Sequence, residues 1–430
     1  MKYTLFFLVV LTLFGCMKDE EVPAEEVISS TSTPNILLII ADDMGKDATP
    51  GFDEGSIKPT TPHINTLKNG GLSFNNFWVN PTCSPTRASI ITGKYGYHTG
   101  VKWANDILSS TENVLQNYIN QQTGNAYATA VVGKWHLSGE DPGFNPETFG
   151  MDYYAGLIRG AVQDYYQWQL TEDGAGSLQT EYITEVFTDL AIDWVNDQSK
   201  PWFLWLAYNA PHTPFHAPPV EMHSQGGLPE YSEGADPMPY YMAAIEAMDF
   251  QIGRMLDGIP ADELANTVII FIGDNGTPNQ VAQAPYSSST VKGSLYQGGV
   301  NVPMFISGQG VNRTGEDNNL VCSTDLLSTI ADLAGVNVST IHDSKSFVSL
   351  LSAEADHREF QYAEMNNGTD DLWTISNGDY KLIVNANGSE EMYHLTADPY
   401  ESTDLLDDPL TNEAQNAKTA LETELTVIRD

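Results

Sequence analysis

Residues 35–43, NILLIIADD, form an apolar run that ends in two aspartates, and this run is the clearest guide to the fold class. Three further runs, at 127–132, 201–208 and 267–272, are equally apolar and rich in β-branched or aromatic residues. Short continuous runs of this kind are typical of parallel strands that are buried on both faces of a sheet. The four runs therefore predict the central strands of a parallel sheet.

Helical periodicity lies between the predicted strands. Apolar residues recur at helical spacing from Ile183 to Trp194, and again from Ile245 to Met255 just before the last of the four runs. Strands that alternate with helices predict an α/β fold. We therefore expect a large sheet, mostly parallel or mixed, that is sandwiched by helices.

The character of the chain changes toward its C-terminal end. Two β-type runs within 372–384 flank Asn377-Gly378, a pair of residues that favours a hairpin turn. The acidic tail that follows can end in a helix. The sequence thus predicts an α/β domain over 34–338 and a smaller C-terminal α+β subdomain over 339–430.

Composition and charge restrict the class of protein. The 430 residues include 57 Asp plus Glu but only 19 Lys plus Arg, which gives a formal net charge of −38. Binding to a nucleic-acid backbone needs dense Lys and Arg, so DNA and RNA are not expected partners. With 41% apolar and 10% aromatic residues, the chain has ample material for a buried core. The sequence predicts a folded, globular protein.

The N-terminal segment has the pattern of an export and anchoring signal. Residues 1–15 combine a cationic start, a short apolar run and a small residue before Cys16, as in a secretory signal peptide. The residues around Cys16 resemble the lipobox of bacterial lipoproteins, which implies a lipid anchor and a tether over 16–33. The alternative is an ordinary signal peptide with an incidental cysteine. The acidic stretch after Cys16 is similar to the export tag of surface lipoproteins, so we expect a place in the bacterial outer membrane, exposed at the cell surface, with the periplasm as the alternative.

Polar side chains follow each of the four predicted strands. In an open parallel sheet the carboxyl ends of the strands form the edge at which ligands bind. We therefore expect three carboxylates, one amide, one lysine and two histidines to converge there. Carboxylate and amide oxygens suit Ca²⁺ or Mg²⁺ rather than zinc. The residues are Asp42, Asp43, Lys134, His136, His212, Asp274 and Asn275.

The most specific segment is CSPTRAS, residues 83–89, which is followed by Thr92-Gly93-Lys94. Pro85 suits the first position of a helix, so Cys83 is expected where free N–H groups and the helix dipole favour an anion. Arg87, one turn further on, could direct its guanidinium to the same place. The segment predicts an anion site at a helix N-terminus.

These motifs resemble the signature of the type I sulfatases, which are arylsulfatase-like enzymes with the alkaline phosphatase superfamily fold. Further blocks are similar to the family and stand in family order, and the resemblance covers nearly everything from Pro34 onward. Two positions depart from the pattern, because Gln297 and Asn301 replace an acid and a base that often pair in the family. The departure implies the loss of one structural ion pair, in whose place a hydrogen bond could form. The other blocks are GKWHL at 133–137, APHTP at 210–214, GDNG at 273–276 and KGSLYQGGV at 292–300.

The resemblance implies a role for each residue of the cluster. A maturing enzyme would convert Cys83 to formylglycine (3-oxoalanine), whose hydrate is the nucleophile, stabilised near Arg87. His212 would protonate the leaving oxygen, and His136 would help to expel sulfate. One Ca²⁺ ion would be held by Asp42, Asp43, Cys83, Asp274 and Asn275, and sulfate would be bound by Lys134, Lys292 and His212.

The expected activity is that of a sulfuric ester hydrolase, a sulfatase that acts on a sulfated carbohydrate. The surface tether and the acidic composition favour algal polysaccharides such as ulvan, carrageenan or fucan, or their oligosaccharides. Two alternatives stay open: a formylglycine-dependent hydrolase of phosphodiesters or phosphonate monoesters, and an inactive glycan-binding lipoprotein. The third cysteine, Cys322, lies in a helix-like apolar run over 320–333 and is expected to be a buried free thiol.

Overall fold

The computed structural model of the chain describes residues 33–139, 144 and 146–430. The predicted signal segment at 1–15 and the lipidation site Cys16 lie outside these residues, so they stay predictions. Residues Thr33–Asp430 form one compact unit. Among the described residues, no helix combines the length and the apolar character that crossing a membrane requires.

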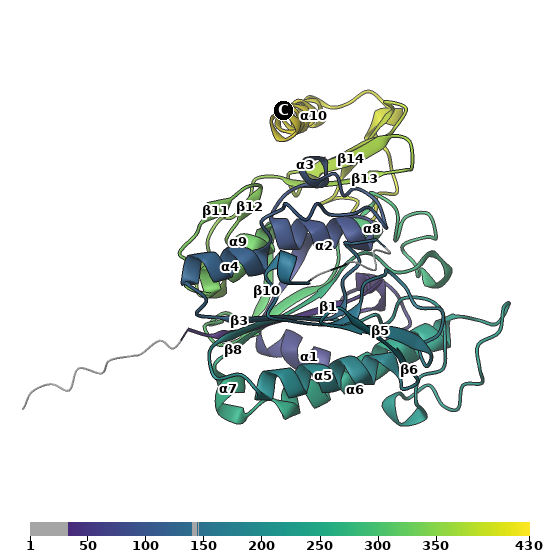
Figure 1. Cartoon of the computed structure of the whole chain (residues 1–430). Helices are drawn as coiled ribbons and strands as arrows, with labels where there is room; N and C mark the ends of the chain where they lie inside the picture. The colour runs from purple at the N-terminus through teal and green to yellow at the C-terminus, as the bar shows by residue number, and fades with distance from the viewer. Residues whose placement is uncertain (1–32, 140–143, 145) are drawn as a thin grey trace, which may run out of the picture. The chain divides into compact units, whose positions relative to one another are not determined.

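A large sheet runs through this unit (Figure 1). It has ten strands in the order β10-β2-β9-β8-β1-β7-β3-β4-β5-β6. The four strands predicted from the sequence are β1, β3, β7 and β8, and they lie side by side and parallel at the centre. β9 is antiparallel to both of its neighbours, and β5 and β6 are antiparallel at one edge, so the sheet is mixed. The strands span Asn35–Ala41 (β1), Leu72–Trp78 (β2), Ala128–Lys134 (β3), Tyr153–Leu157 (β4), Trp168–Glu172 (β5), Ala175–Gln179 (β6), Trp202–Ala207 (β7), Thr267–Gly273 (β8), Met304–Gly308 (β9) and Gly315–Cys322 (β10).

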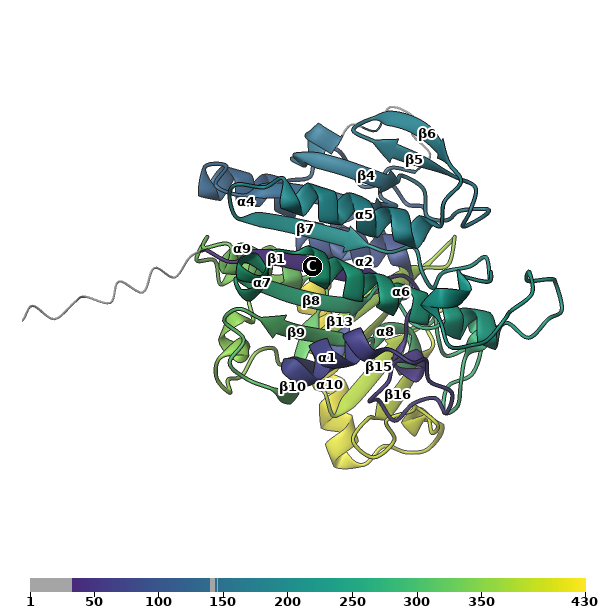
Figure 2. The ribbon, with the colours of Figure 1, turned by 90° about the horizontal axis from the view of Figure 1, so that it is seen from below.

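Helices cover both faces of this sheet, which confirms the predicted sandwich (Figures 1 and 2). Each residue of β1, β3, β7 and β8 is buried, which explains why the four runs are apolar without alternation. The two faces pack into two separate apolar cores. One face carries α1 (Pro62–Gly70), α5 (Ile183–Asn196), α6 (Met238–Gly258) and α7 (Ala261–Ala265), and the other carries α2 (Cys83–Thr92), α4 (Leu115–Thr123) and α9 (Asp325–Leu333).

The predicted helices at 183–194 and 245–255 correspond to α5 and to the second half of α6. The helix-like run at 320–333 is not one element, because β10 ends at Cys322 and α9 begins at Asp325. Buried strand ends and buried helix starts are both continuously apolar, so periodicity alone does not separate them. Cys322 is nevertheless a buried free thiol, as expected.

A second, antiparallel sheet of four strands lies toward the C-terminal end, in the order β13-β14-β15-β16. The predicted hairpin is present, since β14 and β15 pair across Asn377-Gly378. α10 packs on this sheet, and the side chain of Thr411 caps its first turn. The remaining bounds are Gly96–Thr99 (α3), Gln297–Val300 (α8), Thr340–Ile341 (β11), Ser344–Lys345 (β12), Gln361–Asn366 (β13), Asp371–Ser376 (β14), Tyr380–Val384 (β15), Glu390–His394 (β16) and Asn412–Arg429 (α10).

Candidate active site

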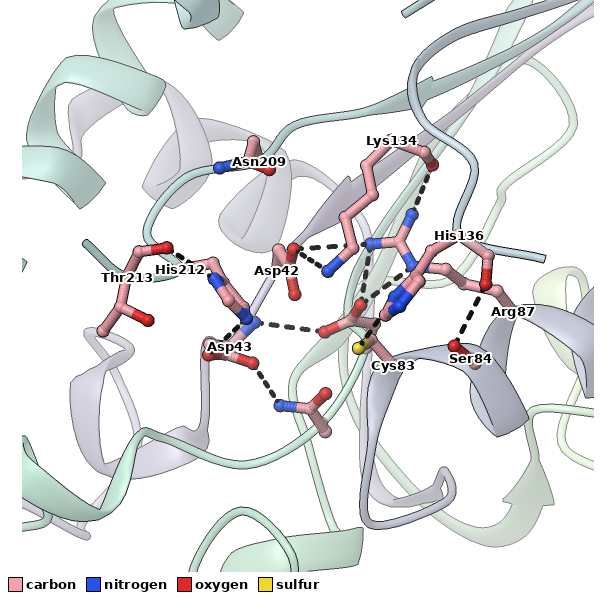
Figure 3. Close-up of polar contacts among 12 residues, drawn as sticks. Asp42, Asp43, Cys83, Ser84, Arg87, Lys134, His136, Asn209, His212 and Thr213 are labelled. Atoms are coloured by element: carbon pink, nitrogen blue, oxygen red, sulfur yellow. Dashed lines mark hydrogen bonds and ion pairs between the residues drawn. The ribbon is translucent and has the colours of Figure 1, made fainter. Parts of the chain in front are cut away.

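The carboxyl ends of the four central strands bring the predicted polar side chains to one place (Figure 3). Asp42 and Asp43 follow β1 directly, and Asp43 adopts a left-handed backbone conformation with φ of 71°. The backbone N–H of Asp43 donates to Asp274 Oδ1 at 3.1 Å, which joins the ends of β1 and β8. Lys134 is the last residue of β3, and His212 lies in the segment after β7. Every predicted member of the cluster is therefore present at this edge.

Cys83 is the first residue of α2, and it lies beside the side chains from the strand ends (Figure 3). Pro85 is the third helical residue and not the first, because the helix begins two residues earlier than its proline indicated. Cys83 is buried, with 2% of its surface exposed, and its Sγ lies 3.2 Å from His136 Nδ1. The predicted helix N-terminus thus faces the cluster, and a histidine nitrogen contacts the thiol.

Arg87 is fully buried and ties two strand ends together. Its Nε and Nη2 donate to Asp274 Oδ2 at 3.1 and 2.7 Å, and its Nη1 donates to the backbone oxygen of Lys134 at 2.6 Å. The guanidinium is therefore directed at Asp274 and β3, and not into the space above Cys83. Arg87 thus holds two strand ends in place, and its charge interacts with Cys83.

Each of the first two aspartates is paired with a lysine. Lys134 Nζ donates to Asp42 Oδ2 at 2.5 Å, and both groups are fully buried. Lys292 Nζ donates to both oxygens of Asp43, at 2.5 and 2.7 Å. His212 Nε2 lies 3.7 Å from Asp43 Oδ2 on the other side. Three cationic or titratable nitrogens thus surround two carboxylates.

Burial and mutual repulsion leave the carboxylates with unequal pKa values. Burial raises the pKa of Asp42, and burial together with the nearby Asp42 raises the pKa of Asp274 to about 6. Burial alone would also raise the pKa of Asp43, but Lys292, His212 and Lys134 outweigh it and hold this pKa well below its usual range. Three acids packed this closely in a buried site favour a bound cation, which would stabilise all three as carboxylates.

The cluster fits the hard cation that the sequence predicts. Asp42 Oδ1 and Asn275 Oδ1 are buried and have no hydrogen-bond partner. Unpaired buried oxygens are costly, and two of them within a carboxylate cluster are what oxygen ligands of Ca²⁺ or Mg²⁺ look like before the ion binds. A group of three possible ligand atoms, one each from Asp42, Asp43 and His212, also lies within 4.8 Å of one another. The unpaired oxygens of Asp42 and Asn275 favour a cation site made of carboxylate and amide oxygens, and His212 then lies next to the site without being a ligand.

The two histidines differ in their surroundings. Burial, then Lys134 and Arg87, lower the pKa of His136 far below its usual range, so this ring is neutral. Burial also lowers the pKa of His212 to about 4, although Asp43 acts in the opposite direction. The Nδ1 of His212 lies 2.7 Å from the backbone oxygen of Thr213, and its side chain is 14% exposed. His136 therefore suits the part of a base, and His212 is the more exposed of the two histidines.

Two further contacts were not expected from the sequence. His136 Nε2 lies 2.9 Å from Asn105 Oδ1, a residue in a turn between α3 and α4. The hydroxyl of Tyr165 donates to the backbone oxygens of Asn209 and His212, at 2.9 and 2.5 Å, and so fixes the segment that carries His212. Neither residue stands in a motif, and only the fold brings them here. Asn301 Nδ2 donates to Gln297 Oε1 at 2.9 Å, so a hydrogen bond does join the two positions that depart from the family pattern.

Two protein-family models match this chain, and together they cover it from residue 34 to residue 430. The family model for sulfatases matches residues 34–336, and the model described as the C-terminal region of N-sulphoglucosamine sulphohydrolase matches residues 291–430. The first match alone covers more than half of the chain. The chain therefore belongs to the sulfatase family, a class of sulfuric ester hydrolases.

Individual relatives agree with this assignment. The chain is 28% identical to an uncharacterized sulfatase, YdeN, of Escherichia coli, over 72% of this chain and 64% of that protein. It is 28% identical to N-acetylgalactosamine-6-sulfatase of Homo sapiens, over 70% of this chain and 62% of that protein. A sulfatase of Formosa agariphila is 25% identical over 94% of this chain and 89% of its own length. The chain thus spans less than two thirds of the first two relatives.

Solved structures resemble the fold over most of the chain. The crystal structure of Ps i-CgsB in complex with k-i-k-neocarrahexaose has a TM-score of 0.77 and 25% identity, and the match covers 92% of both chains. BT4656 in complex with D-glucosamine-2-N,6-O-disulfate has a TM-score of 0.76 at 21% identity, over 93% of this chain and 99% of that chain. The mixed sheet with its small C-terminal antiparallel sheet is the shared fold.

Proposed function

We propose that this chain hydrolyses sulfate esters carried by a sulfated carbohydrate. The observation that carries the proposal is the setting of Cys83, a buried cysteine at the first position of α2 with His136 Nδ1 3.2 Å from its Sγ. Lys134, Lys292 and Arg87 provide positive charge around it, which a sulfate group requires. Membership of the sulfatase family supports the same reading.

Position 83 would not act as an unmodified cysteine. Burial raises the pKa of the Cys83 thiol above its ordinary value, so the thiol stays protonated and is a weak nucleophile. We therefore expect a maturing enzyme to convert it to formylglycine, whose hydrate would supply a hydroxyl nucleophile for the attack on sulfur. The neutral His136 Nδ1 is placed to accept a proton from a hydroxyl group at this position.

Three chain residues would handle the substrate. Lys134 and Lys292 contact the two aspartates in the ligand-free site, and their ammonium groups would neutralise the sulfate oxygens that approach position 83. His212, whose side chain is partly exposed, would donate its Nε2 proton to the oxygen of the leaving alcohol as the S–O bond breaks. The sulfate charge itself favours the protonated form of His212.

Asp42, Asp43, Asp274 and Asn275 would hold one Ca²⁺ ion, as the orphan oxygens of Asp42 and Asn275 indicate. The ion would supply Lewis-acid polarisation of a sulfate oxygen and of the group at position 83. Because Asp274 is also bound to Arg87, the guanidinium fixes the direction in which this ligand points.

The substrate class is a sulfated polysaccharide or oligosaccharide, of the kind found in algae. A structure that matches 92% of this chain was solved in complex with k-i-k-neocarrahexaose. The surface tether and the acidic composition of this chain support the same choice. The alternative is a phosphodiester or phosphonate monoester on the same scaffold. Aryl sulfate and aryl phosphodiester assayed side by side separate the two, and faster phosphodiester turnover would overturn the choice.

The decisive experiment is mass spectrometry of the peptide that contains Cys83. Protein made in a host with the maturing enzyme should carry an aldehyde at this position, and Cys83→Ala should have no sulfatase activity. An unmodified thiol in such a host would instead favour an inactive glycan-binding protein. A panel of defined sulfated oligosaccharides then identifies the sugar and the position of the ester.

We also propose a lipid anchor at Cys16 and a place at the surface of a bacterial outer membrane. The support is the signal-like composition of 1–15 and the lipobox-like residues before Cys16. Labelling with a palmitate analogue in a bacterial host tests this proposal. Incorporation that Cys16→Ala abolishes would support it, and equal labelling of both proteins would contradict it.

A further inference from the structure

The ring of His136 is held from both of its nitrogens. Nδ1 lies 3.2 Å from Cys83 Sγ, and Nε2 lies 2.9 Å from Asn105 Oδ1. An amide oxygen accepts hydrogen bonds and cannot donate one, so Nε2 must carry the proton in this contact. In a neutral imidazole the other nitrogen is then the acceptor. With the amide oxygen of Asn105 toward the ring, this contact favours the tautomer whose Nδ1 lone pair faces position 83.

Asn105 and His136 are also joined through the helix that carries the cysteine. The backbone N–H of Asn105 donates to Ser84 Oγ at 3.1 Å, and Ser84 Oγ donates to the backbone oxygen of His136 at 3.0 Å. Ser84 follows Cys83 in the first turn of α2. Cys83, Ser84, Asn105 and His136 thus form a closed ring of contacts, in which moving one member disturbs the other three.

The turn that carries Asn105 is anchored to the C-terminal sheet. Asp106 Oδ2 accepts from the backbone N–H groups of Lys102 and Trp103, at 2.9 and 2.8 Å. Lys102 Nζ donates to both oxygens of Asp371, the first residue of β14, at 2.7 and 2.6 Å. The small sheet therefore holds the turn in which Asn105, with φ of 70°, presents its side chain to His136.

We propose that Asn105 is the positioning residue that keeps His136 in the Nε2–H tautomer and so aims the Nδ1 lone pair at the group on position 83. The inference rests on the proposed sulfatase function, which it deepens by naming what orients the base. A base in the wrong tautomer offers an N–H where a lone pair is needed, and such a change costs orders of magnitude in rate in other enzymes.

Three variants separate positioning from folding. Asn105→Gly removes the acceptor oxygen and keeps the left-handed backbone, which glycine adopts without strain. Asn105→Asp keeps an acceptor oxygen in the same place. Asn125→Gly is the matched control, because Asn125 is also exposed with φ of 63° but lies in the turn before β3, away from the site. Asn105 is exposed as well, so its removal leaves no buried cavity.

The readouts are steady-state kinetics and the imidazole ¹⁵N spectrum of histidine-labelled protein, with the signal assigned by loss in His136→Gln. Asn105→Gly should lower kcat about 10- to 100-fold, part of what a well-placed acid or base contributes, and leave KM within about two-fold. Its spectrum should show mixed tautomers, whereas Asn105→Asp and Asn125→Gly keep Nε2–H.

Two results would overturn the inference. One is an Asn105→Gly protein that keeps a pure Nε2–H signal, and the other is an unchanged kcat, whether or not KM rises. If the unsubstituted protein has no sulfatase activity at all, the proposed function fails, and the spectra still decide the tautomer question because they need no substrate.

Discussion

Gly160 is the residue that leaves room for the ring of His136. A Cβ placed on Gly160 would lie 2.1 Å from His136 Nε2 and 2.2 Å from Cε1, far inside contact distance. The ring is held by Cys83 and Asn105 at its two nitrogens, so it has no free direction in which to retreat. The smallest possible side chain at this position is therefore incompatible with the present placement of His136.

Gly160→Ala should consequently lower sulfatase activity by at least about 10-fold, because a displaced base loses most of its contribution. Gly176→Ala is the matched control, since a Cβ on Gly176, in β6, meets no atom within 4 Å. Initial rates with an aryl sulfate measure both variants. Equal activity of the two proteins would show that the ring of His136 can move without loss.

The orphan oxygens of Asp42 and Asn275 predict a measurable stabilisation by metal. Calcium that binds the folded protein but not the unfolded chain should raise the melting temperature, and chelation should lower it. Asn275→Ala removes one of these oxygens, so its calcium-dependent shift should be smaller. Thermal melts of each protein, with chelator and with added Ca²⁺, give the shift without an activity assay. A shift that Asn275→Ala leaves unchanged would contradict the assignment of this ligand.

Among the individual residues of the site, the sequence predicted the positions of those that stand in motifs. Each of these residues lies at or soon after the end of an apolar run, so a predicted strand end also predicts its place in the fold. They include Asp42, Lys134, His212 and Asn275. Asn105 could not be found in this way, because its role depends on a contact with a residue 31 positions away across a turn. A polar residue in a loop carries no periodicity, and its partner is defined only by the folded chain.

Asp325 shows how one buried carboxylate holds several elements together. It accepts from the backbone N–H groups of Cys322 and Lys345, at 2.9 and 2.8 Å, and so joins the end of β10 to β12 at the start of α9. Arg358 Nε donates to it at 2.7 Å, and His357 Nε2 lies 3.2 Å away. Burial alone would raise the pKa of Asp325, but Arg358 and then His357 outweigh burial and lower it to about 2.

This shift predicts a pH-dependent part of the stability. A carboxyl group whose folded pKa is depressed from 3.8 to about 2 stabilises the fold above its unfolded pKa, and the effect is lost as the pH falls toward 2. At neutral pH the contribution is roughly 2 kcal/mol, at about 1.4 kcal/mol per pKa unit. Asp325→Asn should therefore differ from the unsubstituted protein most at neutral pH and progressively less below about pH 4.

Denaturant unfolding at a series of pH values measures this difference. Asp189→Asn serves as the control, since Asp189 pairs with Arg254 at 2.7 Å but is 49% exposed, and exposed pairs contribute about 0–1 kcal/mol. A free-energy difference for Asp325→Asn that stays constant down to pH 2 would mean that packing, and not the charge, explains its effect.

Among the strands, the sequence identified the four at the centre and none of those at the edges of the large sheet. β10 begins with Gly315 and is mostly polar up to Asn319, so it lacks both an apolar run and strict alternation. β6 is exposed over four of its five residues. An edge strand forms because it pairs with a neighbouring strand of the folded sheet. Its own residues therefore need no apolar pattern from which the strand could be predicted.

For the whole molecule, the charge of −38 and the cations of the site act over different distances. Lys134 and Arg87 are fully buried within contact of their partners, so added salt screens them little. The exposed carboxylates repel one another across the surface, and this repulsion opposes the compact state. The acidic surface is therefore a cost to stability that salt relieves.

Salt should accordingly stabilise the folded protein. Between about 0.01 M and 0.5 M monovalent salt the screening length falls from about 30 Å to under 8 Å, so the melting temperature should rise, with most of the gain at low concentration. Melts in NaCl and in KCl at equal ionic strength, with Ca²⁺ held constant, separate screening from the binding of a particular ion, because screening acts equally in both. A melting temperature that falls with salt would mean that surface ion pairs such as Arg254 with Asp189, 2.7 Å apart, outweigh the repulsion among the excess carboxylates.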